Sequence, residues 1–391
     1  MKSKSALTII FITVFIDLMG FGILIPILPT FASKQLHISD FGIGVIVASF
    51  SFMQFIFNPI FGRVSDRIGR KPIIIFSLLT TALSYLIFSF ADSFAILLLS
   101  RLLAGFGGSN ISVAQAYIAD VTDESNRAKG MGLIGAAFGL GFVFGPMLGG
   151  ILSQYGYNTV GYASALFSFM AFLFATFKLK ESLKEENKST QKTKYSIFTK
   201  DTLVEVIKNH SLRFTMLIYF IIVFSMANIY GTFALLAYKV YNFTDMQIGY
   251  LYGLIGVVGA IIQGGFIKRL SEKYKDEKLV LAGIFFMMLG LTGLPYGGTF
   301  LGIAIIAGFL AIGSGILQPT ILSMVSKNAK SKNQGSILGL NQSAASMARV
   351  LGPLWGGFAF EYISYQFPFL TGGLFTFAML IGSIYFFNKK R

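Results

Sequence analysis

Apolar runs long enough to cross a membrane recur along the whole chain, and no other feature constrains the fold as strongly. A helix of about 20 apolar residues spans a hydrocarbon core of about 30 Å. Only 13% of the 391 residues are charged, too few to coat a soluble core, since soluble proteins carry about twice that share. The sequence therefore predicts a polytopic helical membrane protein. It excludes a soluble enzyme and, because cysteine is absent, a disulfide scaffold or thiolate site.

Twelve such runs are separated by charged residues, which predicts an all-α protein with twelve transmembrane helices. The first run contains Asp17 and lacks a small-residue cleavage site, so we expect a retained span rather than a signal peptide. The predicted spans lie near residues 6–28, 41–61, 72–91, 94–117, 130–153, 158–178, 212–236, 246–268, 279–297, 299–325, 334–359 and 366–387.

Basic residues are distributed unequally between the two sides of the predicted membrane. Of the 32 Lys and Arg residues, all but Lys34, Arg101, Lys239 and Arg349 lie at the termini or in loops that follow even-numbered spans. Short loops with such an excess are cytoplasmic. We therefore expect a multi-pass protein of the cytoplasmic membrane with both termini inside. The net charge of +15 is interpreted as a topology signal, with binding of anionic lipid headgroups as a secondary possibility.

A polar segment rich in Lys and Glu divides the chain into two six-span halves. We expect an N-terminal six-helix bundle at 1–178, a cytoplasmic linker at 179–211 and a C-terminal six-helix bundle at 212–391. The halves also share a motif, because GPMLGG at 145–150 recurs as GPLWGG at 352–357. Two pseudo-symmetric halves with a site between them at the midplane are a common plan of secondary transporters.

Five segments carry recognisable signatures. GRVSDRIGRKP (62–72) resembles the loop 2–3 signature of the major facilitator superfamily, LSRLLAGFGG (99–108) resembles its span 4 signature, and GLGFVFGPMLGG (139–150) resembles the span 5 motif of its antiporters. DLMGFGILIPILP (17–29) and AYIADVTDESNRAKG (116–130) are similar to the twelve-span branch of tetracycline and multidrug efflux proteins. The resemblance implies a drug:proton antiporter of the cytoplasmic membrane that works by alternating access.

The first of these motifs is expected to act in conformational change. Gly62 removes a side chain where a neighbouring helix must come close. We expect Asp66 to lie at the cytoplasmic N-terminus of span 11, where the positive end of the helix would stabilise its carboxylate. The loop would then act as a conformational latch, because this contact would break when the protein opens inward. Arg67 and Arg70 are interpreted either as part of the latch or as topology anchors.

The span 5 motif places Gly141, Gly145 and Gly149 at every fourth position, on one helix face. Such a face permits close packing against a helix of the other half, and Pro146 favours a bend. The motif is interpreted either as packing alone or, as the resemblance implies, as a gate that suppresses ion leak.

Ionisable residues inside the membrane are costly, so each is a functional candidate. Asp17 is the one acidic residue well within a span, about 16 Å from the start of the span at 1.5 Å per residue. The span 4 resemblance indicates Arg101 as its partner, so we expect Asp17 to carry the coupled proton and Arg101 to tune it. A static salt bridge is the alternative. Three roles remain open for Arg349: pairing with Asp17, binding an anionic group of the substrate, and snorkelling outward to the membrane surface.

Polar residues within the spans are expected to face protein or a cavity rather than lipid. The candidate substrate-binding residues are Gln54, Asn110, Gln318 and Asn341, together with Arg349. Helix–helix hydrogen bonding is the alternative role for each of them.

One departure from the tetracycline exporters bears on the substrate. Those exporters typically carry acids inside spans 3 and 9, whereas SLLTTALSYLIF (77–88) and LAGIFFMMLGL (281–291) contain none. This disfavours a cationic metal–tetracycline complex. We therefore expect export of hydrophobic or amphipathic small molecules, with tetracycline itself in doubt.

The remaining expectations concern cofactors, partners and alternatives. The chain has no Walker P-loop, and its two histidines lie outside the spans, so we expect neither a cofactor nor a metal, with the proton as coupling ion. The expected partners are an amphipathic small molecule, protons and the lipid bilayer, with no nucleic acid, and the chain is expected to be a monomer and not an enzyme. The first alternative is a uniporter or importer of a physiological metabolite or lipid, and the second is a non-transporting membrane receptor.

Overall fold

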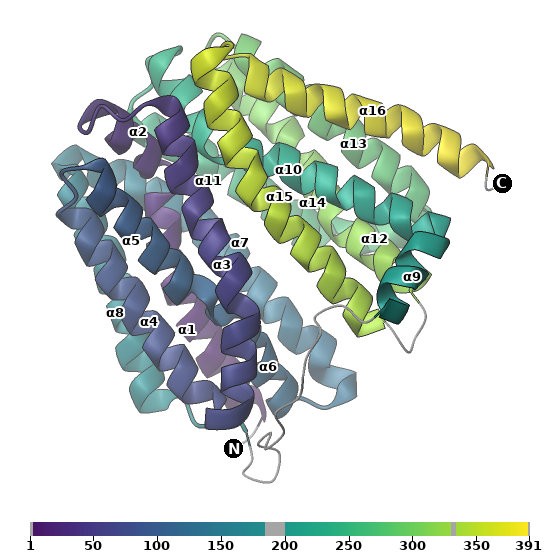
Figure 1. Cartoon of the computed structure of the whole chain (residues 1–391), viewed down its shortest axis with the longest axis horizontal. Helices are drawn as coiled ribbons and strands as arrows, with labels where there is room; N and C mark the ends of the chain where they lie inside the picture. Colours follow the sequence, from purple (N-terminus) through teal and green to yellow (C-terminus); the bar gives the residue numbers. More distant parts are fainter. Residues whose placement is uncertain (1–2, 184–199, 330–333, 390–391) are drawn as a thin grey trace. The chain divides into compact units, whose positions relative to one another are not determined.

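The computed structural model describes residues 3–183, 200–329 and 334–389, and every regular element in these ranges is a helix (Figure 1). Residues 184–199, about half of the predicted linker, lie outside the described residues. The chain divides into two compact units: Met1–Lys192 with Ala237–Gly253, and Thr193–Leu236 with Leu254–Arg391.

The first unit follows the order of the first six predicted spans. Its helices are α1 (Ser3–Leu24), α2 (Ile27–Lys34), α3 (Asp40–Ile68), α4 (Arg70–Ser89), α5 (Phe94–Gly107), α6 (Ile111–Val121), α7 (Glu124–Leu152) and α8 (Tyr157–Lys178). The end of α10 (His210–Lys239) and the start of α11 (Asp245–Ile261) also belong to it. The second unit contains the rest of α10 and α11 with α9 (Lys200–Lys208), α12 (Ile267–Lys273), α13 (Asp276–Gly293), α14 (Phe300–Asn328), α15 (Gln334–Tyr362) and α16 (Phe367–Lys389).

Among the described residues, 11 helical segments are long and apolar enough to cross a membrane. They coincide with predicted spans, and the remaining predicted span, near 334–359, coincides with α15, which is 29 residues long. At 1.5 Å per residue α15 extends over about 43 Å, enough to span a bilayer. Its lower apolar content reflects polar residues such as Asn341 and Arg349. The twelve-helix membrane fold is confirmed.

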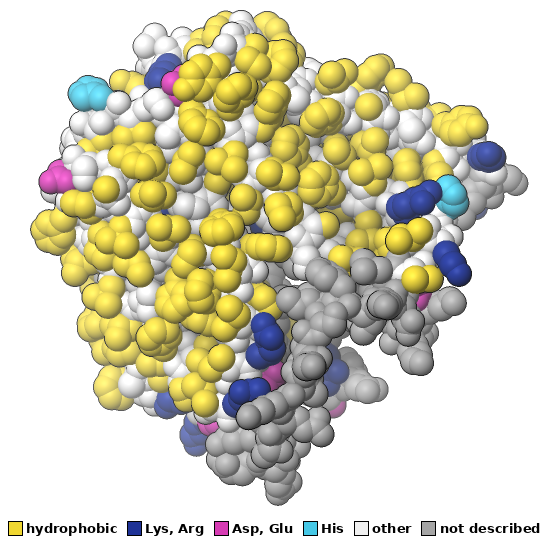
Figure 2. Space-filling model, viewed as in Figure 1, with side chains coloured by type: hydrophobic (Ala, Val, Ile, Leu, Met, Phe, Trp, Pro, Cys, Tyr) yellow, Lys and Arg dark blue, Asp and Glu magenta, His cyan; other side chains and the backbone are white. Residues whose placement is uncertain are grey.

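Side chains on the molecular surface agree with a lipid environment. Figure 2 shows hydrophobic side chains over most of the visible face. Large apolar residues such as Phe76 on α4 and Phe169 and Phe177 on α8 are exposed, as expected where a helix faces lipid rather than water.

Helix α1 packs against α7 and α8 in the first unit. Its residues Ala6, Ile10 and Val14 recur every fourth position and are buried in a core shared with α4, α6 and α8. Where α1 crosses α7, glycine faces glycine: a Cβ at Gly145 would lie 2.6 Å from the Cα of Gly22. Small residues at such a crossing let two membrane helices approach closely.

Spans 4 and 8 are each interrupted within their length. Span 4 is interrupted at Gly108–Asn110, where the backbone of Ser109 leaves the helical range (φ −77°, ψ 17°). The interruption releases backbone carbonyls, and the side-chain amide of Gln54 donates to that of Gly108 (2.9 Å). Span 8 contains a π-helical turn at Ile262–Phe266. Broken backbone of this kind is tolerated in a membrane where side chains bond the freed groups.

The second unit uses the same packing device. Helix α13 packs against α14 and α16. A Cβ at Gly313 on α14 would lie 2.5 Å from the backbone nitrogen of Met287, and one at Gly290 on α13 would lie 2.7 Å from Leu310. The two helices can therefore approach only because neither position carries a side chain.

We predict that Gly145→Ala lowers the thermal stability of the purified protein in detergent. The new methyl group must push α1 and α7 apart, which costs about 1–3 kcal/mol by analogy with other overpacked sites. Gly135→Ala on the same helix is the matched control, because no atom of another described element lies within 4 Å of its Cβ position. Equal unfolding temperatures for the two variants would contradict the close crossing.

Candidate functional site

Asp17 lies in the middle of the first span and is almost fully buried, with 8% of its surface exposed. Ser168 on α8 donates a hydrogen bond to one carboxylate oxygen (Oγ–Oδ1, 2.8 Å). Asn110, at the break in span 4, donates to the other (Nδ2–Oδ2, 3.4 Å). Both donors are neutral, and among the described residues no cation lies within ion-pair distance of this carboxyl group.

Two local features bring these donors to Asp17. Gly20, one turn further along α1, permits the close approach of α8, since a Cβ there would lie 2.8 Å from the carbonyl of Ser164 and 3.2 Å from the hydroxyl of Ser168. The break in span 4 places Asn110 in the turn between α5 and α6, so the direction of its side chain is not set by the regular repeat of one continuous α-helix. Asn110, predicted as a substrate-binding residue, is thus a hydrogen-bond partner of Asp17 in the structure.

Arg101 on α5 does not pair with Asp17 in this structure. Its guanidinium is buried, with 4% exposed, and its carbon lies 5.7 Å from the ring centroid of Tyr85 and 5.9 Å from that of Phe50, distances typical of cation–π contact. Two of its nitrogens, Nε and one terminal nitrogen, have no hydrogen-bond partner among the described residues. The Tyr85 hydroxyl interacts electrostatically with both Asp17 and Arg101.

Sequence reasoning missed Ser168 and Tyr85. Ser168 forms a small polar face with Ser164 four residues earlier, and that spacing in an apolar span was the available signal. Tyr85 lies in the stretch of span 3 that lacks an acid, so the structure places an aromatic hydroxyl, rather than a carboxylate, next to Arg101.

The other candidate binding residues belong to the second unit. Arg349 on α15 is partly buried and donates to the hydroxyl of Ser346 (2.9 Å). Asn341 on the same helix is fully buried, and neither its amide oxygen nor its amide nitrogen has a partner among the described residues. Gln318 on α14 is exposed and forms a hydrogen bond with Tyr219 on α10. These three polar side chains, like Gln54 and Asn110, lie within spans as predicted, and their role toward a substrate stays a prediction.

The loop 2–3 motif forms an ion cluster around Arg70, which is 6% exposed. Its guanidinium donates to Asp66 (2.5 Å), to Ser65 (2.7 Å) and to Asp120 at the end of α6 (3.0 Å). Arg70 is therefore a buried partner of two carboxylates, while Arg67 is exposed, as a topology anchor would be. The contact predicted between Asp66 and the start of span 11 stays a prediction.

Glu181, just after α8, closes this cluster from the linker side. Its carboxylate accepts hydrogen bonds from the backbone nitrogens of Arg70 (2.9 Å) and Lys71 (3.1 Å) and so satisfies orphan donors at the N-terminus of α4. Gly69, at φ 111°, leaves room for it, because a Cβ there would overlap the Glu181 carboxylate. No local pattern in the sequence predicted this contact, because it joins residues far apart along the chain.

Two packing predictions were wrong. The nearest described atom to a Cβ at Gly62 is the Ser112 hydroxyl at 3.9 Å, so no close helix approach exists there. The face of Gly141, Gly145 and Gly149 meets Leu18, Gly22 and Ile23 of α1, a helix of the same half, rather than a helix of the other half. The reason is that α1 supplies a small residue of its own at the crossing.

A different face of the same segment meets α11. A Cβ at Gly249 on α11 would overlap the carbonyl of Pro146, and the start of α11, at Asp245 and Met246, approaches Gly150 to within 2.8 Å of its Cβ position. Pro146 and Gly150 thus contact a helix from the second half of the sequence, within the first unit. A gating role for this motif stays a prediction.

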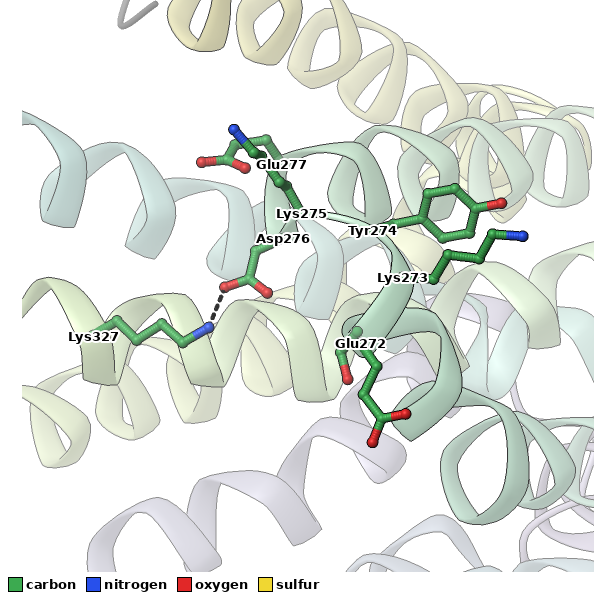
Figure 3. A pocket seen from close by; sticks show the side chains of 8 residues that line it. Glu272, Lys273, Tyr274, Lys275, Asp276, Glu277 and Lys327 are labelled. Atoms are coloured by element: carbon green, nitrogen blue, oxygen red, sulfur yellow. Dashed lines mark hydrogen bonds and ion pairs between the residues drawn. The ribbon is translucent and has the colours of Figure 1, made fainter.

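The second unit repeats the ion pair of the loop 2–3 motif with reversed charges. Lys327 at the end of α14 bonds to Asp276 at the start of α13 (2.7 Å), beside a polar surface depression of about 420 Å³ (Figure 3). The separation of Asp120 and Lys327 along the sequence equals that of the two GPxxGG motifs, so the two residues occupy corresponding positions in the two halves. An acid at a helix start and a base at a helix end agree with the helix dipoles, whereas Arg70 and Asp120 oppose them.

Comparisons with known proteins agree on one family. The family model of the Major Facilitator Superfamily matches residues 10–353 and 264–391. Multidrug resistance protein 2 of Bacillus subtilis is 30% identical over 97% of this chain and 94% of its own. Tetracycline resistance protein, class H, of Pasteurella multocida is 31% identical over 99% and 97%. The solved human organic anion transporter MFSD10 is 23% identical, with a TM-score of 0.72 over 97% and 99%, which speaks to the fold alone. The predicted resemblance is confirmed.

We predict that Asp120→Asn destabilises the protein more than Asp276→Asn. The first change removes a carboxylate from the buried Arg70 and should cost about 1–3 kcal/mol. The second affects a lysine that is 65% exposed, and exposed pairs contribute about 0–1 kcal/mol. Thermal unfolding of the two variants beside the wild type tests this, and an equal or reversed order would contradict a structural role for the Arg70 cluster.

Proposed function

Because the chain belongs to the Major Facilitator Superfamily, a family of transporters, we propose that it is a proton-coupled exporter of amphipathic small molecules. The transport cycle would be alternating access between its two halves. The names of the relatives support this proposal, since they are resistance proteins for several drugs or for tetracycline.

The observation that carries proton coupling is the environment of Asp17. A carboxyl group held by a hydroxyl and an amide can lose or gain a proton without breaking a salt bridge, because both donors are neutral. Its burial in the first span makes the charged form costly. The protonation state of Asp17 would therefore change the affinity for the substrate, and bound substrate would change the affinity of Asp17 for its proton. Arg101 and Tyr85 are the polar neighbours of this group.

The proposed membrane topology determines the direction of transport: protons move inward and the substrate moves outward. Both termini and the basic loops lie in the cytoplasm in this proposal, because of the positive-inside bias of Lys and Arg. The membrane of residence is the cytoplasmic membrane, where inward proton movement releases about 2.3 kcal/mol for each charge per 100 mV. The Arg70 cluster and the span 5 motif would serve as conformational contacts that form and break during the cycle.

The substrate class follows from what lines the spans. The stretches of spans 3 and 9 contain no acid, so a cationic metal–tetracycline complex is disfavoured even though tetracycline exporters are among the relatives. The candidates Gln54, Asn110 and Gln318 are neutral polar groups among apolar side chains, a lining suited to amphipathic molecules.

We predict that Asp17→Asn abolishes proton-driven transport and leaves the protein folded, because an amide of the same shape cannot carry the proton. The assay uses proteoliposomes with an imposed pH gradient and follows lumenal pH while cationic, neutral and anionic amphiphiles are added. Asp92→Asn is the matched control, since Asp92 is exposed in a loop and its loss should leave the flux at the wild-type level.

Two results would contradict the proposal. Driven transport retained in Asp17→Asn would remove Asp17 from proton coupling. Wild-type transport that is insensitive to collapse of the proton gradient would instead support a uniporter or an importer of a metabolite.

A further inference from the structure

Among the described residues, three side chains that are charged at neutral pH lie deep inside the membrane spans, and their charges do not cancel. Asp17 and Arg101 belong to the first unit and Arg349 to the second. Arg349 lies near the middle of α15, about 20 Å from either end at 1.5 Å per residue. The described acids of the second unit lie near helix ends or in loops and include Glu272, Asp276, Glu277 and Glu361.

The partners of Arg349 among the described residues are all neutral. Its guanidinium donates to the hydroxyl of Ser346 (2.9 Å) and interacts electrostatically with the hydroxyls of Tyr219 and Tyr230 on α10. Tyr219 is 3% exposed and is itself held by Gln318. Among the described residues no carboxylate lies within 4.0 Å of this guanidinium.

Asn341 is a second, independent observation on the same helix. It lies about two turns before Arg349, is 0% exposed, and has no partner among the described residues for either its amide oxygen or its amide nitrogen. A buried polar group without a partner costs free energy, and so does an uncompensated charge within a membrane span. The same helix carries both costs, and a ligand that pairs with these groups would relieve them.

We propose that Arg349 forms a subsite for the anionic group of an amphipathic substrate, a carboxylate, sulfonate or phosphate. The guanidinium presents a planar fork of donors that matches such a group in a bidentate manner, and Tyr219 and Gln318 supply neutral groups beside it. The proposal rests on the proposed function as a transporter of amphiphiles and names the charge of its substrate.

The single tryptophan offers a direct test, because Trp355 lies six residues after Arg349 on α15. Quenching of its fluorescence is measured in the purified full chain in detergent, without a proton gradient. The probes are a nitrophenyl alkyl carboxylate, the primary amide of the same skeleton and the corresponding primary ammonium. We expect the carboxylate to bind wild type at least about tenfold more tightly than the amide or the ammonium, as two charge-assisted hydrogen bonds allow.

Arg349→Gln should remove this preference while amide binding persists, and Arg349→Lys should retain part of it, because a point charge remains. Arg269→Gln is the matched control, since Arg269 is exposed on α12, and should behave as wild type. Arg349→Gln should also unfold at the same temperature as wild type or at a higher one, because an uncompensated cation is removed.

Several outcomes would overturn the proposal: equal affinities in wild type, a preference that survives in Arg349→Gln, or a lower unfolding temperature of that variant, which marks a structural residue. Chloride that competes with the carboxylate at equal affinity would identify a site for small inorganic ions instead. Because the assay needs no gradient, failure of proton coupling leaves it intact. Proton-driven export of neutral amphiphiles without any preference for anions would overturn this inference alone.

Discussion

The membrane interior penalises every unpaired charge and backbone group, and the first unit is arranged to meet that constraint at one place. The carboxyl group of Asp17 is buried where α1, α8 and the break in span 4 converge. Gly20 lets the helices come close enough for a hydroxyl to reach it. The break exposes a carbonyl that Gln54 satisfies. The buried carboxyl group of Asp17, the break in span 4 and the close helix approach at Gly20 therefore depend on one another.

The twelve spans were predictable because hydropathy over about 20 residues reports on the bilayer itself. The interruption at Gly108–Asn110 was not predictable, because no proline marks it and its hydrogen bonds come from another helix. The sequence also did not show which helix the glycine face of α7 packs against. The spacing of Gly141 and Gly145 shows that something packs closely there, but only the tertiary structure shows that α1 supplies the matching Gly22.

The candidate site was predictable where one residue type is decisive on its own. Asp17 and Arg349 stand out because charge inside a span is rare. Ser168 and Tyr85 do not stand out, since serine and tyrosine are common in membrane helices, and only their position next to Asp17 and Arg101 makes them part of the site. Pairing was the least predictable property: Arg101 contacts aromatic rings rather than the expected carboxylate.

The pairing of the two lysines on the predicted external side has an electrostatic consequence. Lys34 lies 3.2 Å from Asp245 and Lys239 lies 2.6 Å from Asp40, so both are neutralised within the first unit. Among the described residues of the first unit, no lysine or arginine on the predicted external side then remains to balance Asp92. We therefore expect the external loops of this unit to carry a net negative formal charge, which concentrates cations, protons included, at a surface.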